Sequence, residues 1–126
     1  MKTAHIALQY KDKKEADIWF SKILGLDKEK EFTLKSDLSR DIFGIDRDVD
    51  AALYSDGETA FEVFFTGEKP SVYYEHICLV VEEREDFLAL CRDEGLQVNE
   101  IKKGEKALFF VTDHAGYLYE VKEGAK

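Results

Sequence analysis

The stretch His5-Ile6-Ala7-Leu8 near the start of the chain is matched by His76-Ile77-Cys78-Leu79 in its second half. A second pair of stretches follows in the same order, Phe61-Glu62-Val63 and Tyr119-Glu120-Val121. Between these landmarks a Gly-Leu pair also occurs twice, at positions 25–26 and 95–96. Landmarks that recur in one order indicate a duplicated structural unit. The sequence therefore predicts two related modules, each beginning near a histidine and ending near a glutamate.

The spacing of apolar residues predicts the same elements in both halves. Alternating apolar and polar residues indicate strands, and apolar residues three and four positions apart indicate helices. In the first half we expect strands at 3–10, 31–34, 49–54 and 59–66 and a helix at 13–24. In the second half we expect strands at 75–81, 97–101, 106–112 and 117–122 and a helix at 82–94.

This order defines the predicted fold class as α+β. Each half is a βαβββ module, with modules at approximately 1–67 and 72–124 inside a single domain that covers 1–126. Gly67 to Pro70 is the expected connector, because it contains the only proline.

Composition restricts the class of protein. At 126 residues the chain is long enough for one domain with an apolar core. No apolar run approaches the roughly 20 residues of a membrane helix, and the chain begins without a signal-like segment, so we expect a cytoplasmic protein. Eighteen Lys and Arg against 27 Asp and Glu give a net charge of −9, which disfavours nucleic acid and anionic membranes as partners. Cys78 and Cys91 are expected to be buried free thiols.

The two halves differ in length between their landmarks. From His5 to Glu62 is 57 residues, whereas from His76 to Glu120 is 44. The extra length falls between the predicted strands 31–34 and 49–54, so we expect a loop insertion over 35–48 with Ile42, Phe43 and Ile45 as a small apolar plug. Loops on a rigid scaffold often determine substrate specificity.

Strand alternation places two histidines and two glutamates on corresponding faces. His5 and His76 lie opposite the Ile/Leu side of their strands, and Glu62 and Glu120 lie opposite the larger apolar residues of theirs. A carboxylate on an inner face must be paired, protonated or bound to a cation. Taken singly, each histidine is more simply explained as a hydrogen-bonded core or rim residue. Their repetition in register favours a divalent-metal site, with a decayed copy that has kept the residues without the ion as the alternative.

These residues resemble the vicinal oxygen chelate superfamily, which includes glyoxalase I, bleomycin-resistance proteins and ring-cleaving dioxygenases. The chain is similar in its first strand, in the helix that ends at Leu24-Gly25-Leu26, and in the closing strand Asp113-His114-Ala115-Gly116-Tyr117-Leu118-Tyr119-Glu120-Val121. The resemblance implies two βαβββ modules whose eight strands form a curled mixed sheet around a central cavity. It also implies one metal in that cavity, held by His5, Glu62, His76 and Glu120. His114 lies in a turn and is left out of this set.

The order His, Glu, His, Glu is similar to that of bacterial-type glyoxalase I. The resemblance implies a metal-dependent lyase, isomerase or epimerase that acts on a small molecule with vicinal oxygens through an enediolate. Glu120 is the implied catalytic base, Glu62 is its symmetry-related partner, and a homodimer is the implied assembly. The metal stays open among Zn, Ni, Co, Mn and Fe.

One position departs from the glyoxalase I pattern. Where that family usually has an arginine that binds glutathione, four residues beyond the first histidine, this chain has Gln9. Arg40 and Arg47 in the insertion could supply replacement contacts, or they could belong to a solvated charged loop. The alternatives for the whole chain are a non-catalytic drug-sequestering protein of the bleomycin-resistance type and a ring-cleaving dioxygenase.

Overall fold

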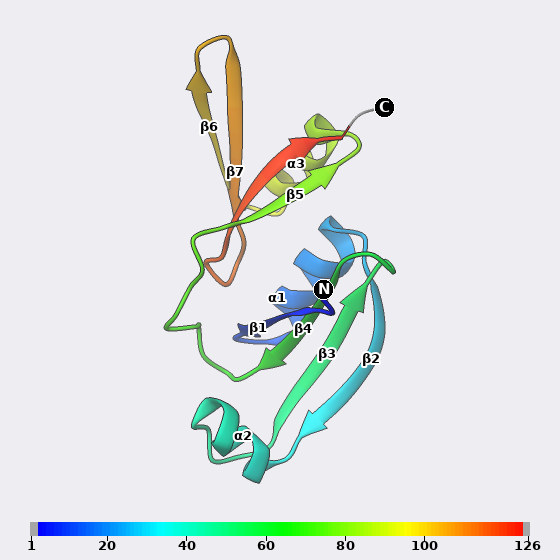
Figure 1. The fold of residues 1–126 in the computed structure, drawn as a ribbon, viewed down its shortest axis with the longest axis vertical. Helices are drawn as coiled ribbons and strands as arrows, with labels where there is room; N and C mark the ends of the chain where they lie inside the picture. The colour runs from blue at the N-terminus through cyan, green and yellow to red at the C-terminus, as the bar shows by residue number, and fades with distance from the viewer. Residues whose placement is uncertain (1–2, 125–126) are drawn as a thin grey trace. The chain divides into compact units, whose positions relative to one another are not determined.

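The computed structural model describes residues 3–124 (Figure 1). The chain divides into two compact units, the first ending at Pro70 and the second beginning at Ser71. Each unit contains one four-stranded mixed sheet, and the two sheets have corresponding strand orders. The predicted α+β fold with two βαβββ modules is confirmed. No helix among residues 3–124 is long and apolar enough to cross a membrane.

The sheet of the first unit has the spatial order β1–β4–β3–β2. Its strands are β1 (Ile6–Tyr10), β2 (Asp27–Leu34), β3 (Val49–Ser55) and β4 (Ala60–Phe65). The outer strand β1 runs parallel to β4, and the other neighbours are antiparallel. All four predicted strands are present, and β2 begins four residues earlier than expected.

A helical segment covers one face of this first sheet. It consists of α1 (Lys13–Ala16) continued by the π-helical stretch η1 (Asp17–Ile23). The carboxylate of Asp12 accepts a hydrogen bond from the Glu15 amide and caps the start, and Gly25, with φ of 72°, follows its end. The predicted apolar stripe faces the sheet, with buried side chains at Ala16, Trp19, Phe20 and Ile23.

Aromatic rings form the centre of this core. The ring of Phe20 lies 5.0–5.3 Å from the rings of Tyr10, Tyr54 and Phe61, measured between centroids. Such pairs stabilise a core beyond the area that they bury. The face of the sheet that carries Tyr10 and Phe61 is therefore closed by the helix, as the alternation of the sequence predicts.

The segment between β2 and β3 corrects the sequence prediction. In place of a loop over 35–48, the structure contains an eight-residue helix, α2 (Ser36–Phe43), which ends at Gly44 with φ of 73°. The residue at its N-terminal cap position, Lys35, makes no capping hydrogen bond through its side chain. Instead the Asp48 carboxylate accepts a hydrogen bond from the Ser36 amide, from twelve residues further along. This long-range cap is the physical reason why local capping signals do not reveal the helix.

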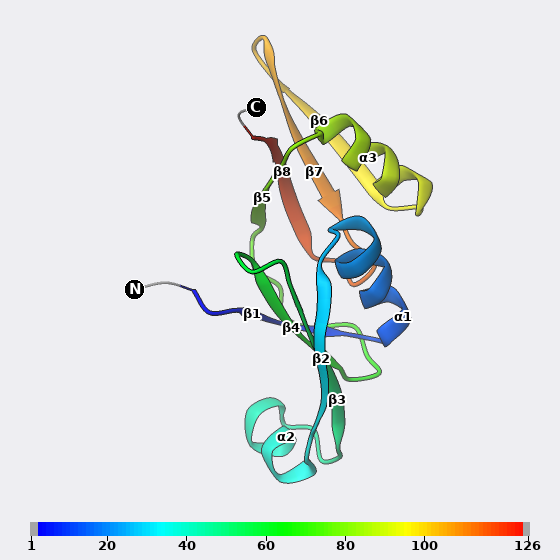
Figure 2. The same cartoon turned by 90° about the vertical axis from the view of Figure 1, so that its right-hand side faces the viewer.

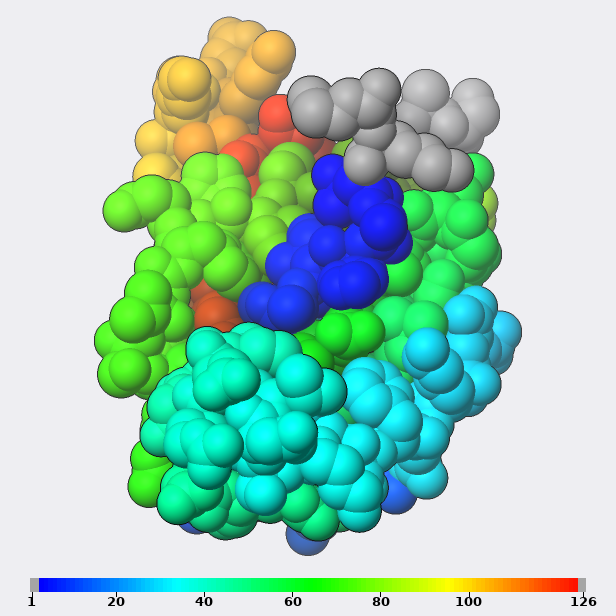
Figure 3. Space-filling view, turned by 60° about the horizontal axis from the view of Figure 1, so that its bottom comes forward, coloured from blue at the N-terminus to red at the C-terminus, as the bar shows by residue number. Residues whose placement is uncertain are grey.

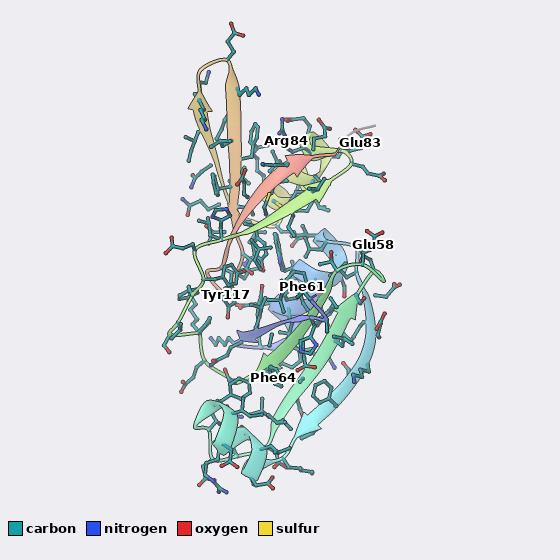
Figure 4. The ribbon with its side chains drawn as sticks, in the orientation of Figure 1. Glu58, Phe61, Phe64, Glu83, Arg84 and Tyr117 are labelled. Atoms are coloured by element: carbon teal, nitrogen blue, oxygen red, sulfur yellow. The ribbon has the colours of Figure 1, made fainter. Side chains whose placement is uncertain are left out.

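The helix α2 packs on the face of the first sheet opposite α1. Phe43 and Ile45 contact the buried cluster of Val49, Ala51 and Phe64, and the rings of Phe43 and Phe64 lie 4.8 Å apart. Ile42 is 61% exposed, so the expected plug contains two of its three residues. Figure 3 looks onto α2, and Figure 4 labels Phe64. The helix α2 therefore covers one end of the sheet face that lies opposite α1.

The second unit repeats the arrangement in the order β5–β8–β7–β6. Its strands are β5 (Ile77–Val81), β6 (Gln97–Lys103), β7 (Lys106–Thr112) and β8 (Leu118–Glu123). The helix α3 (Arg84–Asp93) lies against one face of the sheet (Figure 2). Within the described part of this unit, no helix corresponds to α2.

The two cysteines differ in burial. Both are free, and Cys91 is buried in α3 as expected. Burial raises the pKa of the Cys91 thiol to about 12. Cys78 is exposed, which corrects the expectation of a buried thiol. The reason is its place in β5, where alternation turns it away from the face that α3 covers.

Candidate metal centre

The two histidines occupy corresponding places in the two units. His5 immediately precedes β1, and His76 immediately precedes β5. The two glutamates also correspond, because Glu62 is the third residue of β4 and Glu120 is the third residue of β8. Since each histidine strand is hydrogen-bonded in parallel to its glutamate strand, each unit brings one imidazole beside one carboxylate.

The two His–Glu pairs have nearly the same geometry. His5 Nε2 lies 3.7 Å from Glu62 Oε1, and His76 Nε2 lies 3.4 Å from Glu120 Oε1. Both histidine side chains are 41% exposed, whereas the glutamates are 21% and 15% exposed. The structure therefore brings the four predicted residues together as two pairs, one inside each unit.

The separation within each pair suits donors that share an ion. Two ligands about 2.1 Å from a tetrahedral ion lie about 3.4 Å from each other, which is longer than an ordinary N–H···O hydrogen bond. Both histidines present Nε2, which is a common metal-ligating nitrogen. Within the described part of either unit, no third His, Cys, Asp or Glu side chain joins the pair in a group able to hold a metal. Each unit thus contains one imidazole and one carboxylate whose spacing suits two ligands of one ion.

The surroundings of the two pairs are not identical. Across the antiparallel neighbour strand, Glu62 is in register with Leu53 and Glu120 is in register with Phe110. The Phe110 ring lies edge-on to the His76 imidazole at 5.7 Å between centroids. This contact restrains the orientation of the His76 ring, whereas the aliphatic Leu53 occupies the corresponding register position in the first unit.

An aspartate turn precedes each glutamate strand. The Asp113 carboxylate accepts hydrogen bonds from the amides of Ala115 and Tyr117, and Tyr73 Oη donates to the Ala115 carbonyl. Tyr117, which Figure 4 labels, stacks on Tyr74 with ring centroids 5.0 Å apart. This network fixes the start of β8 and hence the place of Glu120.

The first unit uses a shorter turn of the same kind. The Asp56 carboxylate accepts hydrogen bonds from the amides of Glu58 and Thr59, and these bonds lower the pKa of Asp56. Asp56 lies six residues before Glu62, and Asp113 lies seven residues before Glu120. This further correspondence between the halves can be read from the spacing in the sequence.

The two arginines and Gln9 considered from sequence have structural partners inside the first unit. Arg40 pairs with Asp46 at 3.2 Å, and Arg47 donates to the carbonyl of Thr66. Gln9 Nε2 donates to Thr66 Oγ1 at 2.7 Å. His114 is half-buried in its turn, with its Nε2 atom covered. These contacts lie within the units and do not extend either His–Glu pair.

Comparisons with known proteins identify the architecture. No protein-family model matches this sequence, and no curated protein matches it. A solved glyoxalase family protein from Bacillus cereus is 17% identical and superimposes with a TM-score of 0.75, covering 98% of this chain and 93% of that protein. The trypanothione-dependent glyoxalase I of Leishmania major is 17% identical with a TM-score of 0.73, covering 98% and 86%. The chain has the fold of the vicinal oxygen chelate superfamily.

A third structure with the vicinal oxygen chelate fold contains a metal. It is a variant of the fosfomycin resistance protein FosX from Listeria monocytogenes in complex with Mn(II) and 1S,2S-dihydroxypropylphosphonic acid. It is 16% identical to this chain with a TM-score of 0.72, covering 98% of this chain and 92% of that one. At such identities the likeness concerns the fold, so the roles of the four residues depend on the geometry of the two pairs.

Proposed function

We propose that His5, Glu62, His76 and Glu120 together bind one divalent metal ion. We further propose that the protein is a glyoxalase-like lyase, isomerase or epimerase for a small molecule with vicinal oxygens. The observation that carries the proposal is the occurrence of one His–Glu pair of the same construction in each unit, at 3.7 and 3.4 Å. The two half-sites would combine within one chain or across a homodimer.

The donor set is consistent with several metals. Two imidazoles and two carboxylates suit Zn, Ni, Co, Mn or Fe, and the FosX structure with Mn(II) supports a divalent ion in this fold. A bound ion would polarise two adjacent substrate oxygens and stabilise the negative charge that develops on them when the neighbouring carbon loses a proton.

The protein's own carboxylates would move that proton. We assign Glu120 as the base that removes it and Glu62 as the partner on the symmetry-related side. The Glu120 side chain is 15% exposed, so few water molecules compete for its oxygens. The edge of Phe110 holds the His76 ring in place beside it. Glu120 is thus the less exposed of the two carboxylates.

Elemental analysis and turnover assays test this function. Protein purified without added metal is analysed for bound ions and then assayed with methylglyoxal hemithioacetal and with 2-methylacyl thioesters. We expect turnover of one class of substrate, loss of turnover in Glu120→Gln, and normal turnover in Glu100→Gln, which changes an exposed residue of β6. Equal turnover by Glu120→Gln and the native chain would contradict the assignment of the base.

The same preparation distinguishes the alternatives. Oxygen uptake with a catechol would indicate ring cleavage. Tight binding of an aromatic or cationic drug by metal-free protein, without turnover, would indicate a sequestering protein. Neither result is expected if all four residues are ligands.

A further inference from the structure

The two units differ two residues beyond the glutamates, at the next position on the same face of each strand. In the first unit Gln9 of β1 is in register with Phe64 of β4. In the second unit the corresponding pair is Val80 of β5 and Lys122 of β8. Because alternate residues of a strand share a face, Phe64 and Lys122 lie on the same faces as Glu62 and Glu120.

In the first unit this position is closed. Phe64 is 5% exposed and packs against Phe43 of α2. The Gln9 amide is engaged with Thr66 Oγ1 at 2.7 Å, so it already has a partner inside the unit. Neither side chain is available to hold a charged group of a ligand.

In the second unit the corresponding position is open and carries a positive charge. The Lys122 side chain is 60% exposed, and Val80 beside it is 68% exposed. Lys122 Nζ lies 3.9 Å from Glu120 Oε2, while His76 Nε2 lies near the other oxygen of the same carboxylate. The ammonium group is therefore adjacent to the proposed metal ligands without being one of them.

We propose that Lys122 binds an anionic group of the substrate. The inference rests on the proposed function. When the Glu120 carboxylate binds a metal, it shares its negative charge with the ion, so the Lys122 ammonium can pair with another anion. Same-face residues of a strand lie about 6.6 Å apart, so the anion lies roughly that far from the chelated oxygens. The substrate class is a small molecule with vicinal oxygens and one carboxylate, phosphate or phosphonate a few bonds away.

A pair of synthetic chelators tests this position without knowledge of the substrate. A hydroxamate presents two vicinal oxygens to a metal, and succinic monohydroxamic acid carries a carboxylate at the other end of a short chain. Its primary amide is the matched neutral probe. Both are titrated by calorimetry into the Mn²⁺-loaded native chain and into the variants Lys122→Gln and Lys122→Arg. A third variant, Lys106→Gln, removes a lysine from the far end of the β6–β7 hairpin.

We expect the native chain to bind the acid about fivefold more tightly than the amide, the size of a partly exposed ion pair. Lys122→Gln should lose this preference while it keeps its Mn²⁺, and Lys122→Arg and Lys106→Gln should retain it. Equal affinities of the native chain for acid and amide, or a preference that survives in Lys122→Gln, would overturn the inference while normal Mn²⁺ uptake leaves the metal site standing. A native chain that takes up no Mn²⁺ would overturn the proposed function and this inference with it.

Discussion

Cys78 lies beside Glu120 in the register of the parallel strands β5 and β8. In the first unit the residue beside Glu62 is Ala7, so the correspondence between the units is broken at this point by a thiol. Cys78 is exposed, whereas Cys91 is buried in α3. Any group attached to Cys78 is therefore attached next to a proposed metal ligand.

This relationship predicts unequal reactivity of the two cysteines. A maleimide should label Cys78 rapidly and Cys91 only slowly in the folded protein, because the thiolate is the nucleophile and burial raises the pKa of Cys91 to about 12. Labelling should also reduce metal uptake, and prior loading with metal should slow labelling. Mass spectrometry of the labelled chain measures both effects.

The variant Cys78→Ala provides the control. It recreates the Ala7–Glu62 arrangement of the first unit, so it should bind metal normally and resist the maleimide. If complete labelling of Cys78 left metal uptake unchanged, this thiol would not be part of the surroundings of the proposed metal centre.

Gly116→Ala should destabilise the second unit. Gly116 has φ of 100°, and an added Cβ would lie 3.0 Å from Tyr73 Oη, the atom that donates to the Ala115 carbonyl. Gly57 has φ of 92° in the first unit, but its added Cβ would meet nothing within 4 Å. We expect Gly57→Ala to cost about 1–2 kcal/mol of unfolding free energy and Gly116→Ala about 1–3 kcal/mol more. Urea unfolding followed by far-ultraviolet circular dichroism measures both, and equal losses would rule out a contribution from Tyr73.

Asp17 should make the first unit sensitive to acid. Its carboxylate accepts a hydrogen bond from Tyr54 Oη at 2.7 Å and lies 2.8 Å from Lys28 Nζ. Burial raises the pKa of Asp17, but the bonds from Lys28 and Tyr54 outweigh it, so the pKa falls below its ordinary value of 3.8. A lowered folded-state pKa stabilises the fold above the unfolded-state pKa, and this stabilisation is lost as the pH falls through the folded-state pKa.

Asp17→Asn should therefore be less stable than the native chain at pH 7 and should approach it at an acid pH below the folded-state pKa of Asp17. The side chain is 40% exposed, so solvent screening limits the expected loss at pH 7 to about 1 kcal/mol. Urea unfolding followed by the fluorescence of Trp19, which is buried in the same unit, measures the difference. A loss of the same size at both pH values would show that the charge of Asp17 is not its cause.

The sequence predicts the repeated parts of this fold better than the unique parts. The strands beginning at Ile6 and Ile77 have clear alternation and a counterpart in the other half, and both are found. The helix α2 has no counterpart, and its cap comes from Asp48 across the insertion, so local patterns miss it. The prediction that Cys78 is buried rests on its apolar neighbours, but Cys78 lies on the face of β5 away from α3 and is exposed.

The same difference between repeated and unique parts holds for the candidate site. Parity along single strands predicts that the two histidines and two glutamates lie on inner faces of their strands. The structure adds that the parallel pairings β1–β4 and β5–β8 bring each histidine beside the glutamate of its own unit. The role of Lys122 follows from comparison of two registers, in which Phe64 takes its place in the first unit. Strand alternation alone does not predict that Lys122 in the second sheet occupies the position that Phe64 has in the first sheet.

Metal stoichiometry in a set of histidine variants tests the shared site most directly. The native chain, His5→Ala, His76→Ala and the control His114→Ala are equilibrated with Mn²⁺ or Zn²⁺, freed of unbound metal and analysed by inductively coupled plasma mass spectrometry. We expect one ion per chain in the native protein and His114→Ala, and almost none in His5→Ala and His76→Ala, with circular dichroism unchanged. Undiminished metal content in His76→Ala, or in His5→Ala, would contradict a single centre built from both units.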